Sequence, residues 1–171
     1  MAKKLLSDFD KLKFSVSATT RLPRPGEKEG RDYHFITAQE FQERVQKGQF
    51  LEWEEFYNGT MYGTLKAHVE SELEKGYFIM LDVDVLGALN VKKIYGENAL
   101  SIFIKPPSMD ILEERLRNRG TESEESLKIR LERAEKEITY AEKFDRVIVN
   151  DNIETAYSKI YKAVKNFISN Q

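Results

Sequence analysis

Two arginines stand three residues apart in the segment Ser17-Ala-Thr-Thr-Arg21-Leu-Pro-Arg24-Pro-Gly, between a predicted strand and a proline turn. A guanidinium presents a planar set of N–H donors that matches the oxygens of a phosphate, and a stiff loop lowers the cost of holding two guanidiniums together. A bare pair of arginines at this spacing is usually a solvated basic loop. The flanking hydroxyls and the two prolines favour an anion site here.

A second group combines aromatic, hydroxyl and carboxylate side chains, namely Tyr33, Glu52, Tyr62 and Thr64. Tyrosine hydroxyls donate to phosphate, and a half-buried carboxylate can accept two donors side by side, which suits the N1–H and amino group of guanine. Adenine lacks that pair of donors, so a buried acceptor would discriminate between the two bases. The structural alternative places Glu52 on an exposed strand face beside core aromatics.

Asp82 and Asp84 follow a short apolar run that is typical of a strand. In open parallel sheets, ligands bind at the carboxyl ends of the strands. An aspartate at such a position can hold Mg²⁺, directly or through water, and its neighbour can contact a substrate. A turn that simply ends in aspartates is the alternative, but the position after an apolar run favours function.

Basic side chains gather around a predicted Gly-Thr turn at residues 120–121, with Arg115 and Arg119 before it and Arg130 after it. On a helix, such charges are ordinarily a solvated face. Arginines on both sides of a turn between helices could, however, close over a polyphosphate as a lid.

Short apolar runs alternate with helical patterns, which predicts an α/β fold. Strands are expected at residues 14–17, 50–56, 77–83, 100–105 and 146–150. Thr37 and Glu40 form a predicted capping box for a helix that ends at Gly48. Further helices are expected from Thr64 to Gly76, from Ser108 to Gly120, over residues 124–143, and from about residue 153 towards the C-terminus.

The composition excludes several classes of protein. The 171 residues contain 27 Lys and Arg against 29 Asp and Glu, a net charge of −2, which argues against nucleic acid or an anionic membrane as a partner. The absence of cysteine excludes thiol catalysis and cysteine-ligated zinc, and two separated histidines argue against a histidine metal site. No apolar run is long enough to span a bilayer. We expect a single cytoplasmic domain, as a monomer or homodimer.

Taken in order, these segments resemble the guanylate kinase family from about residue 14 to the C-terminus. The motifs that carry the resemblance are Phe-Ser-Val-Ser-Ala-Thr-Thr-Arg, Asp-Tyr-His-Phe, Phe-Leu-Glu-Trp, Tyr-Gly-Thr, Leu-Asp-Val-Asp, Pro-Pro-Ser, Arg-Gly-Thr and Val-Ile-Val-Asn-Asp. The resemblance implies a parallel-sheet core like that of P-loop kinases, with helices on both faces, formed by residues 1–30 and 77–171. It also implies an inserted GMP-binding α/β region at about 31–76 and a helical lid at about 115–135.

The resemblance further implies transfer of a phosphoryl group from ATP to GMP, and by the same contacts to dGMP, with Mg²⁺ as cofactor. The GMP phosphate would be held by Arg21, Arg24, Tyr33 and Tyr62, and the guanine end by Ser17, Glu52, Thr64 and Asp84. ATP would be bound by Arg115 and Asn150. The remaining catalytic set would be Arg119 and Arg130 as lid arginines and Asp82 near the metal, directly or through water.

Two features depart from the family pattern. Leu86 stands where the family usually has glutamine, for which we expect a mild effect. The 171 residues also contain no phosphate loop of the form G-x-x-x-x-G-K-[ST], and the first residues look like the end of the helix that should follow it. We expect a strand and loop of roughly fifteen to twenty residues to precede residue 1.

The alternative is a chain without an ATP site, which would bind GMP with little or no turnover. A related reading is a binding module, like the guanylate-kinase-like domains of scaffold proteins that grip a phosphorylated partner. Retention of the full GMP set and of Arg119 and Arg130 argues against a scaffold, which has no use for a catalytic lid.

Overall fold

The computed structural model describes residues 1–56, 59–118 and 123–171. The chain divides into two compact units, residues 2–94 and residues 95–171, the second of which includes Met1. Arg119 lies outside the described residues, and so does the predicted end of the third helix at Gly120. Within the described ranges, no helix is long and apolar enough to cross a membrane.

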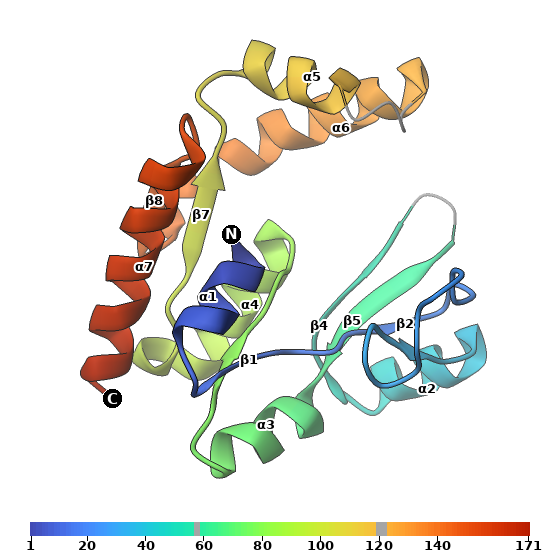
Figure 1. Ribbon diagram of the computed structural model, residues 1–171. Helices are drawn as coiled ribbons and strands as arrows, with labels where there is room; N and C mark the ends of the chain where they lie inside the picture. The colour runs from blue at the N-terminus through green and yellow to red at the C-terminus, as the bar shows by residue number, and fades with distance from the viewer. Residues whose placement is uncertain (57–58, 119–122) are drawn as a thin grey trace. The chain divides into compact units, whose positions relative to one another are not determined.

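The unit of residues 2–94 combines two sheets with four helices among its described residues (Figure 1). Its elements are α1 (Ala2–Asp8), β1 (Leu12–Phe14), β2 (Ala18–Thr19), β3 (His34–Phe35), α2 (Ala38–Gln46), β4 (Phe50–Glu55), β5 (Met61–Leu65), α3 (Lys66–Glu74), β6 (Phe78–Met80) and α4 (Val85–Tyr95), whose last residue falls in the other unit. β1 and β6 form a parallel pair in which Leu12 faces Phe78. The other sheet has the order β3-β2-β5-β4.

The four-stranded sheet is mixed, because β2 pairs in parallel with β3 and antiparallel with β5. Its core holds Ala18, Phe41 and Met61, all buried, and the Phe41 ring stacks on Phe50 with 4.4 Å between centroids. β4 and β5 are an antiparallel pair in which Trp53 faces Gly63. A Cβ added at Gly63 would lie 2.8 Å from the Phe50 ring and 2.9 Å from the Glu52 carbonyl oxygen, so only glycine permits this close packing.

The unit of residues 95–171 is built on a second parallel pair, β7 with β8, in which Ile102 faces Arg146. Its elements are η1 (Gly96–Asn98), β7 (Ile102–Lys105), α5 (Met109–Asn118), α6 (Glu124–Ile138), η2 (Ala141–Lys143), β8 (Arg146–Val149) and α7 (Ile153–Ser169). The Asp145 carboxylate accepts from the Ser101 amide and hydroxyl, both at 2.8 Å, which fixes the start of the two strands. α7 packs along β8 (Figure 1).

The structure confirms the α/β class and several predicted element ends. Thr37 caps α2 by accepting from the Glu40 amide at 3.1 Å, Gly48 follows the helix at φ +62°, and Ser108 accepts from the Ile111 amide at the start of α5. The capping box also predicts that the Glu40 carboxylate reaches back to the Thr37 amide. This part of the prediction was wrong, since the carboxylate accepts from Arg44 instead.

Other expectations are corrected. Thr64 does not begin a helix but lies in β5, and α3 begins at Lys66. The strand predicted at 14–17 was wrong, because β1 ends at Phe14, residues 15–17 belong to no strand, and β2 begins at Ala18. In place of one parallel sheet, the described residues form two parallel pairs and one mixed sheet. α4 and the strands β2, β3 and β5 were not predicted, and the helix expected over 124–143 ends at Ile138.

Candidate functional site

A pocket of about 360 Å³ lies between β4, the end of α2 and the start of α4, with Glu52 and Asp84 both on its wall. The two carboxylates meet at Gly87. A Cβ added there would lie 2.8 Å from Asp84 Oδ1 and 3.1 Å from Glu52 Oε2. A glycine at this position therefore leaves room for both acidic side chains beside the pocket.

Glu52 is held by its strand partner. Thr64 faces it across the β4–β5 pair, is almost fully buried, and hydrogen bonds to the Glu52 carboxylate. Burial raises the pKa of Glu52 above its ordinary value of 4.5, against the Thr64 hydrogen bond, which lowers it, and with the Asp84 charge, which raises it further. The structure thus confirms that Glu52 is a partly buried acceptor and not an exposed strand residue.

Asp84 has a structural role as well as a place in the pocket. Its Oδ1 accepts from the Gly87 amide at 2.7 Å, which satisfies a donor in the first turn of α4. Asn90, further along α4, donates through Nδ2 to the Leu51 carbonyl and so ties the helix to β4. Asp82 is exposed between β6 and α4, and the described part of the chain holds no cluster of three or more metal-ligating side chains.

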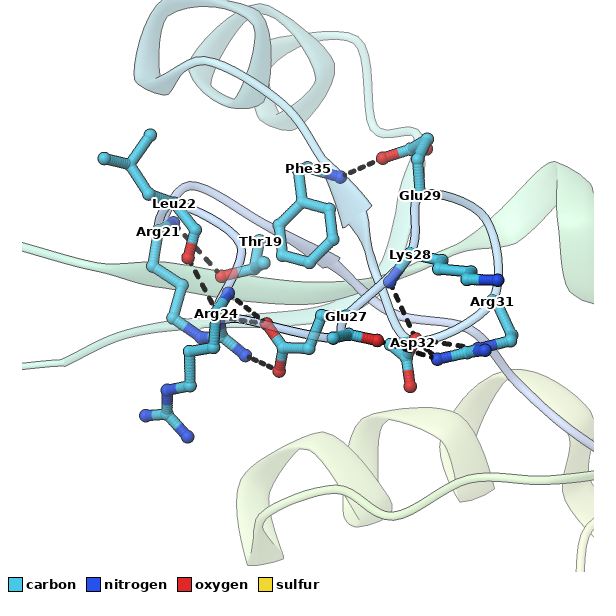
Figure 2. A network of polar contacts seen from close by, with 11 residues as sticks. Thr19, Arg21, Leu22, Arg24, Glu27, Lys28, Glu29, Arg31, Asp32 and Phe35 are labelled. Carbon is cyan, nitrogen blue, oxygen red and sulfur yellow. Dashed lines mark hydrogen bonds and ion pairs between the residues drawn. The ribbon is translucent and has the colours of Figure 1, made fainter.

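A second cluster brings together three of the predicted phosphate ligands. The Arg21 guanidinium lies over the Tyr33 ring, 4.9 Å from its centroid, and hydrogen bonds to Tyr62. The Tyr33 and Tyr62 rings contact each other edge to face at 5.9 Å. Arg24 is exposed, and Figure 2 shows its guanidinium pointing away from Arg21. Ser17 lies just before β2, and its carbonyl accepts from the His34 amide of β3 at 2.9 Å.

Glu27 is the residue of this cluster that the sequence interpretation missed. Its two carboxylate oxygens accept from Arg21 Nη1 and Nη2, each at 2.7 Å, and one of them also accepts from the Arg24 amide at 2.7 Å (Figure 2). These bonds lower the pKa of Glu27 to about 2, with the Arg21 hydrogen bonds as the main cause, so the carboxylate is ionised at neutral pH. The spacing Arg-x-x-Arg-x-x-Glu across a Pro-Gly turn was the available signal.

In the unit of residues 95–171, the structure joins the two predicted ATP ligands. Arg115 Nη1 donates to the Asn150 carbonyl at 2.8 Å, and Nη2 donates to the Asp151 carbonyl at 3.2 Å. Arg130 is exposed on α6. Arg119 belongs to the part of the chain that is not described, so its predicted place in the lid stays a prediction.

Comparison with known proteins places these features in one family. A sequence model of the family described as guanylate kinase matches residues 1–168. The chain is 48% identical over 167 residues to a guanylate kinase of Bacteroides thetaiotaomicron, covering 98% of this chain and 82% of the relative. It is also 48% identical over 164 residues to one from Bacteroides fragilis, covering 96% and 80%. A crystal structure of guanylate kinase from Anaplasma phagocytophilum matches with a TM-score of 0.75 and 36% identity, covering 96% of this chain and 79% of that one. A chain that carries the Glu52 and Arg21 clusters and matches the family over nearly its whole length belongs to the guanylate kinases.

Proposed function

We propose that the unit of residues 2–94 binds GMP and that Arg115, Arg119, Arg130 and Asn150 act on ATP. Guanylate kinases catalyse the transfer of a phosphoryl group from ATP to GMP, which gives ADP and GDP. The observation that carries the proposal is the pair of carboxylates, Glu52 and Asp84, on the wall of a single pocket. A nucleobase that presents neighbouring N–H donors satisfies such a pair, whereas adenine does not.

Glu52 accepts the N1–H and amino group of guanine in this proposal, with Thr64 and Asp84 beside it. The raised pKa of Glu52 reflects burial that removes water from the carboxylate, and no cation among the described residues appears as its partner, so bound donors offset that cost. A ligand without these donors leaves the buried acceptor unsatisfied. Ser17, just before β2, also belongs to the residues that we assign to the guanine end.

Arg21, Arg24, Tyr33 and Tyr62 hold the phosphate of GMP. Tyr62 and Thr64 are two positions apart on β5 and so project from the same face of the strand. One strand thereby supplies both the phosphate subsite and the guanine subsite. The same contacts admit dGMP.

The phosphate oxygen of GMP attacks the terminal phosphorus of ATP, and catalysis comes from positioning and neutralisation of charge. Arg119 and Arg130 neutralise charge on the transferring group, and Arg115 with Asn150 holds the ATP end. Asp82 fits Mg²⁺, since this cation is commonly held by one or two carboxylates together with substrate phosphates and water, and Asp82 is an exposed carboxylate. When bound, Mg²⁺ supplies further neutralisation of the phosphates.

The test is calorimetric binding of GMP, AMP and guanosine to the 171-residue protein, followed by a coupled assay of ADP production with ATP and Mg²⁺. We expect GMP to bind at least about 100-fold more tightly than AMP, because only GMP satisfies Glu52. E52A should remove most of this preference while leaving the chain folded. Equal affinity for GMP and AMP in the wild-type protein would contradict the proposal.

A further inference from the structure

Arg21 has a partner within its own loop. Nη1 donates to Glu27 Oε2 at 2.7 Å and to the Leu22 carbonyl at 3.0 Å, and Nη2 donates to Glu27 Oε1 at 2.7 Å (Figure 2). A guanidinium has two edges that can each bind an anion through two hydrogen bonds. The end-on edge, formed by Nη1 and Nη2, is filled by Glu27.

The side-on edge of the same guanidinium is formed by Nε and the second N–H of Nη2. Unlike the end-on edge, it is not filled by Glu27. Nε is buried and has no hydrogen-bond partner among the described residues. A buried donor without a partner is rare in folded proteins and costs free energy until something accepts from it. Tyr62, which hydrogen bonds to Arg21, is the side chain that we assign to the same phosphate.

Glu27 also fixes the loop around the arginine. Its Oε2 accepts from the Arg24 amide at 2.7 Å, so a single carboxylate joins the Arg21 side chain to the Arg24 backbone. Both partners of the ion pair are largely buried, with side chains 14% exposed for Arg21 and 19% for Glu27. Release of Glu27 would break three short hydrogen bonds at once, which makes it a fixed part of the loop.

We propose that Glu27 is a positioning residue for the GMP phosphate, which holds the end-on edge of Arg21 and leaves the Nε donor for a phosphate oxygen. The inference rests on the proposed function, because it assumes that Arg21 binds the phosphate. Glu27 does not touch the substrate. It acts by removing the rotational freedom of Arg21 before the ligand arrives, so that freedom is not lost on binding.

The test measures dissociation constants of GMP and of guanosine for the wild-type protein, E27Q and E27A. We expect E27Q to weaken GMP binding about tenfold and E27A to weaken it more, since the bidentate pair is reduced and then lost. Guanosine has no phosphate, so its affinity should stay within about twofold in both variants. The ratio of the two constants isolates the phosphate subsite from any general effect on folding.

Glu29 supplies the matched control, because it lies two residues further along the same loop and its carboxylate accepts from the Phe35 amide and His34, not from an arginine. E29Q should leave the GMP constant within about twofold of wild type. Unchanged or tighter GMP binding by E27Q would overturn the inference and identify Glu27 as an idle or competing anion. Equal weakening of GMP and guanosine would overturn it too. Failure of the wild-type protein to bind GMP in preference to AMP would instead reject the proposed function.

Discussion

Glu52 is a carboxylate that the fold partly buries, and this burial has a consequence for stability. Its pKa is raised in the folded protein, mainly by burial. A raised acidic pKa means that the charged form is disfavoured in the folded state. The resulting loss of stability is absent below the unfolded value near 4.5 and is complete above the folded pKa.

We therefore expect E52Q to be more stable than wild type at pH 7.5, by about 2–4 °C in Tm, and to bind GMP at least about tenfold more weakly. The difference in Tm should close as the pH falls to 4, where the wild-type carboxyl is also neutral. Thermal unfolding at several pH values, followed by circular dichroism, measures this. Glu55, exposed at the end of β4, provides the control variant E55Q. A lower Tm for E52Q at pH 7.5 would mean that the Thr64 hydrogen bond outweighs the burial.

Single residues of the site were predictable where their chemical type is distinctive. Arg21, Glu52 and Asp84 were identified from type and spacing, and the structure places Glu52 and Asp84 in one pocket. Glu27 was not, because an exposed Pro-Gly turn rich in charge looks solvated in sequence. Only the fold shows that its carboxylate reaches back to an arginine six positions earlier.

Among the secondary-structure elements, it is the close packing of β4 against β5 that supports the pocket. Gly63 allows it, because a Cβ would meet the Glu52 carbonyl oxygen and Trp53 Cβ at 2.9 Å, and neither atom can move alone. At Gly87 the nearest atoms instead belong to the Asp84 and Glu52 side chains and not to the backbone. The two glycines therefore serve different purposes, one in the fold and one in the site.

We expect G63A to destabilise the protein by about 1–3 kcal/mol, as overpacking of a tight interior does. G87A should have a smaller effect on stability, since alanine favours the helix and the crowded side chains can turn, but should weaken GMP binding at least about tenfold. Urea unfolding and calorimetry on both variants separate the two effects. The same loss of stability in both variants would contradict this division between fold and site.

The elements that the sequence failed to predict are those whose signal is short or mixed. β2 and β3 have two residues each, too few for any periodicity to show. β5 contains a glycine and a threonine, which read as a turn and a helix cap. Asp84 was taken only as the end of the strand predicted at 77–83, although its carboxylate accepts from the Gly87 amide as an N-cap does and α4 begins at the next residue, Val85. Tertiary pairing, not local preference, decides these segments.

Over the whole chain, the residues assigned to the two substrates belong to different compact units. Those assigned to GMP lie within residues 2–94, whereas Arg115 and Asn150 lie within 95–171 and contact each other. The hydrogen bonds that Arg115 donates to the Asn150 and Asp151 carbonyls stay inside its own unit. A substitution in one unit should therefore change the affinity only for the substrate that we assign to that unit.

We expect R115A to leave the GMP dissociation constant within about twofold of wild type, because none of the contacts of Arg115 with Asn150 or Asp151 involves the GMP residues. The same variant should release the loop at Asn150 and increase amide hydrogen exchange there. Calorimetry and hydrogen-exchange mass spectrometry measure the two effects. A GMP constant that rises tenfold would show that the two units share the site.

The pairing of β1 with β6 has a further consequence, for synthesis of the chain. About sixty residues separate the two strands, and they include the whole four-stranded sheet, so that sheet is the crossover connection of a parallel pair. At roughly 5–20 residues per second, a ribosome needs roughly 3–13 s to make them. During that interval β1 is without β6, the strand with which it pairs in the described part of the chain, while β4 and β5 can already pair. The edge of β1 that pairs with β6 therefore stays open for seconds in each new molecule, until Phe78 emerges to meet Leu12.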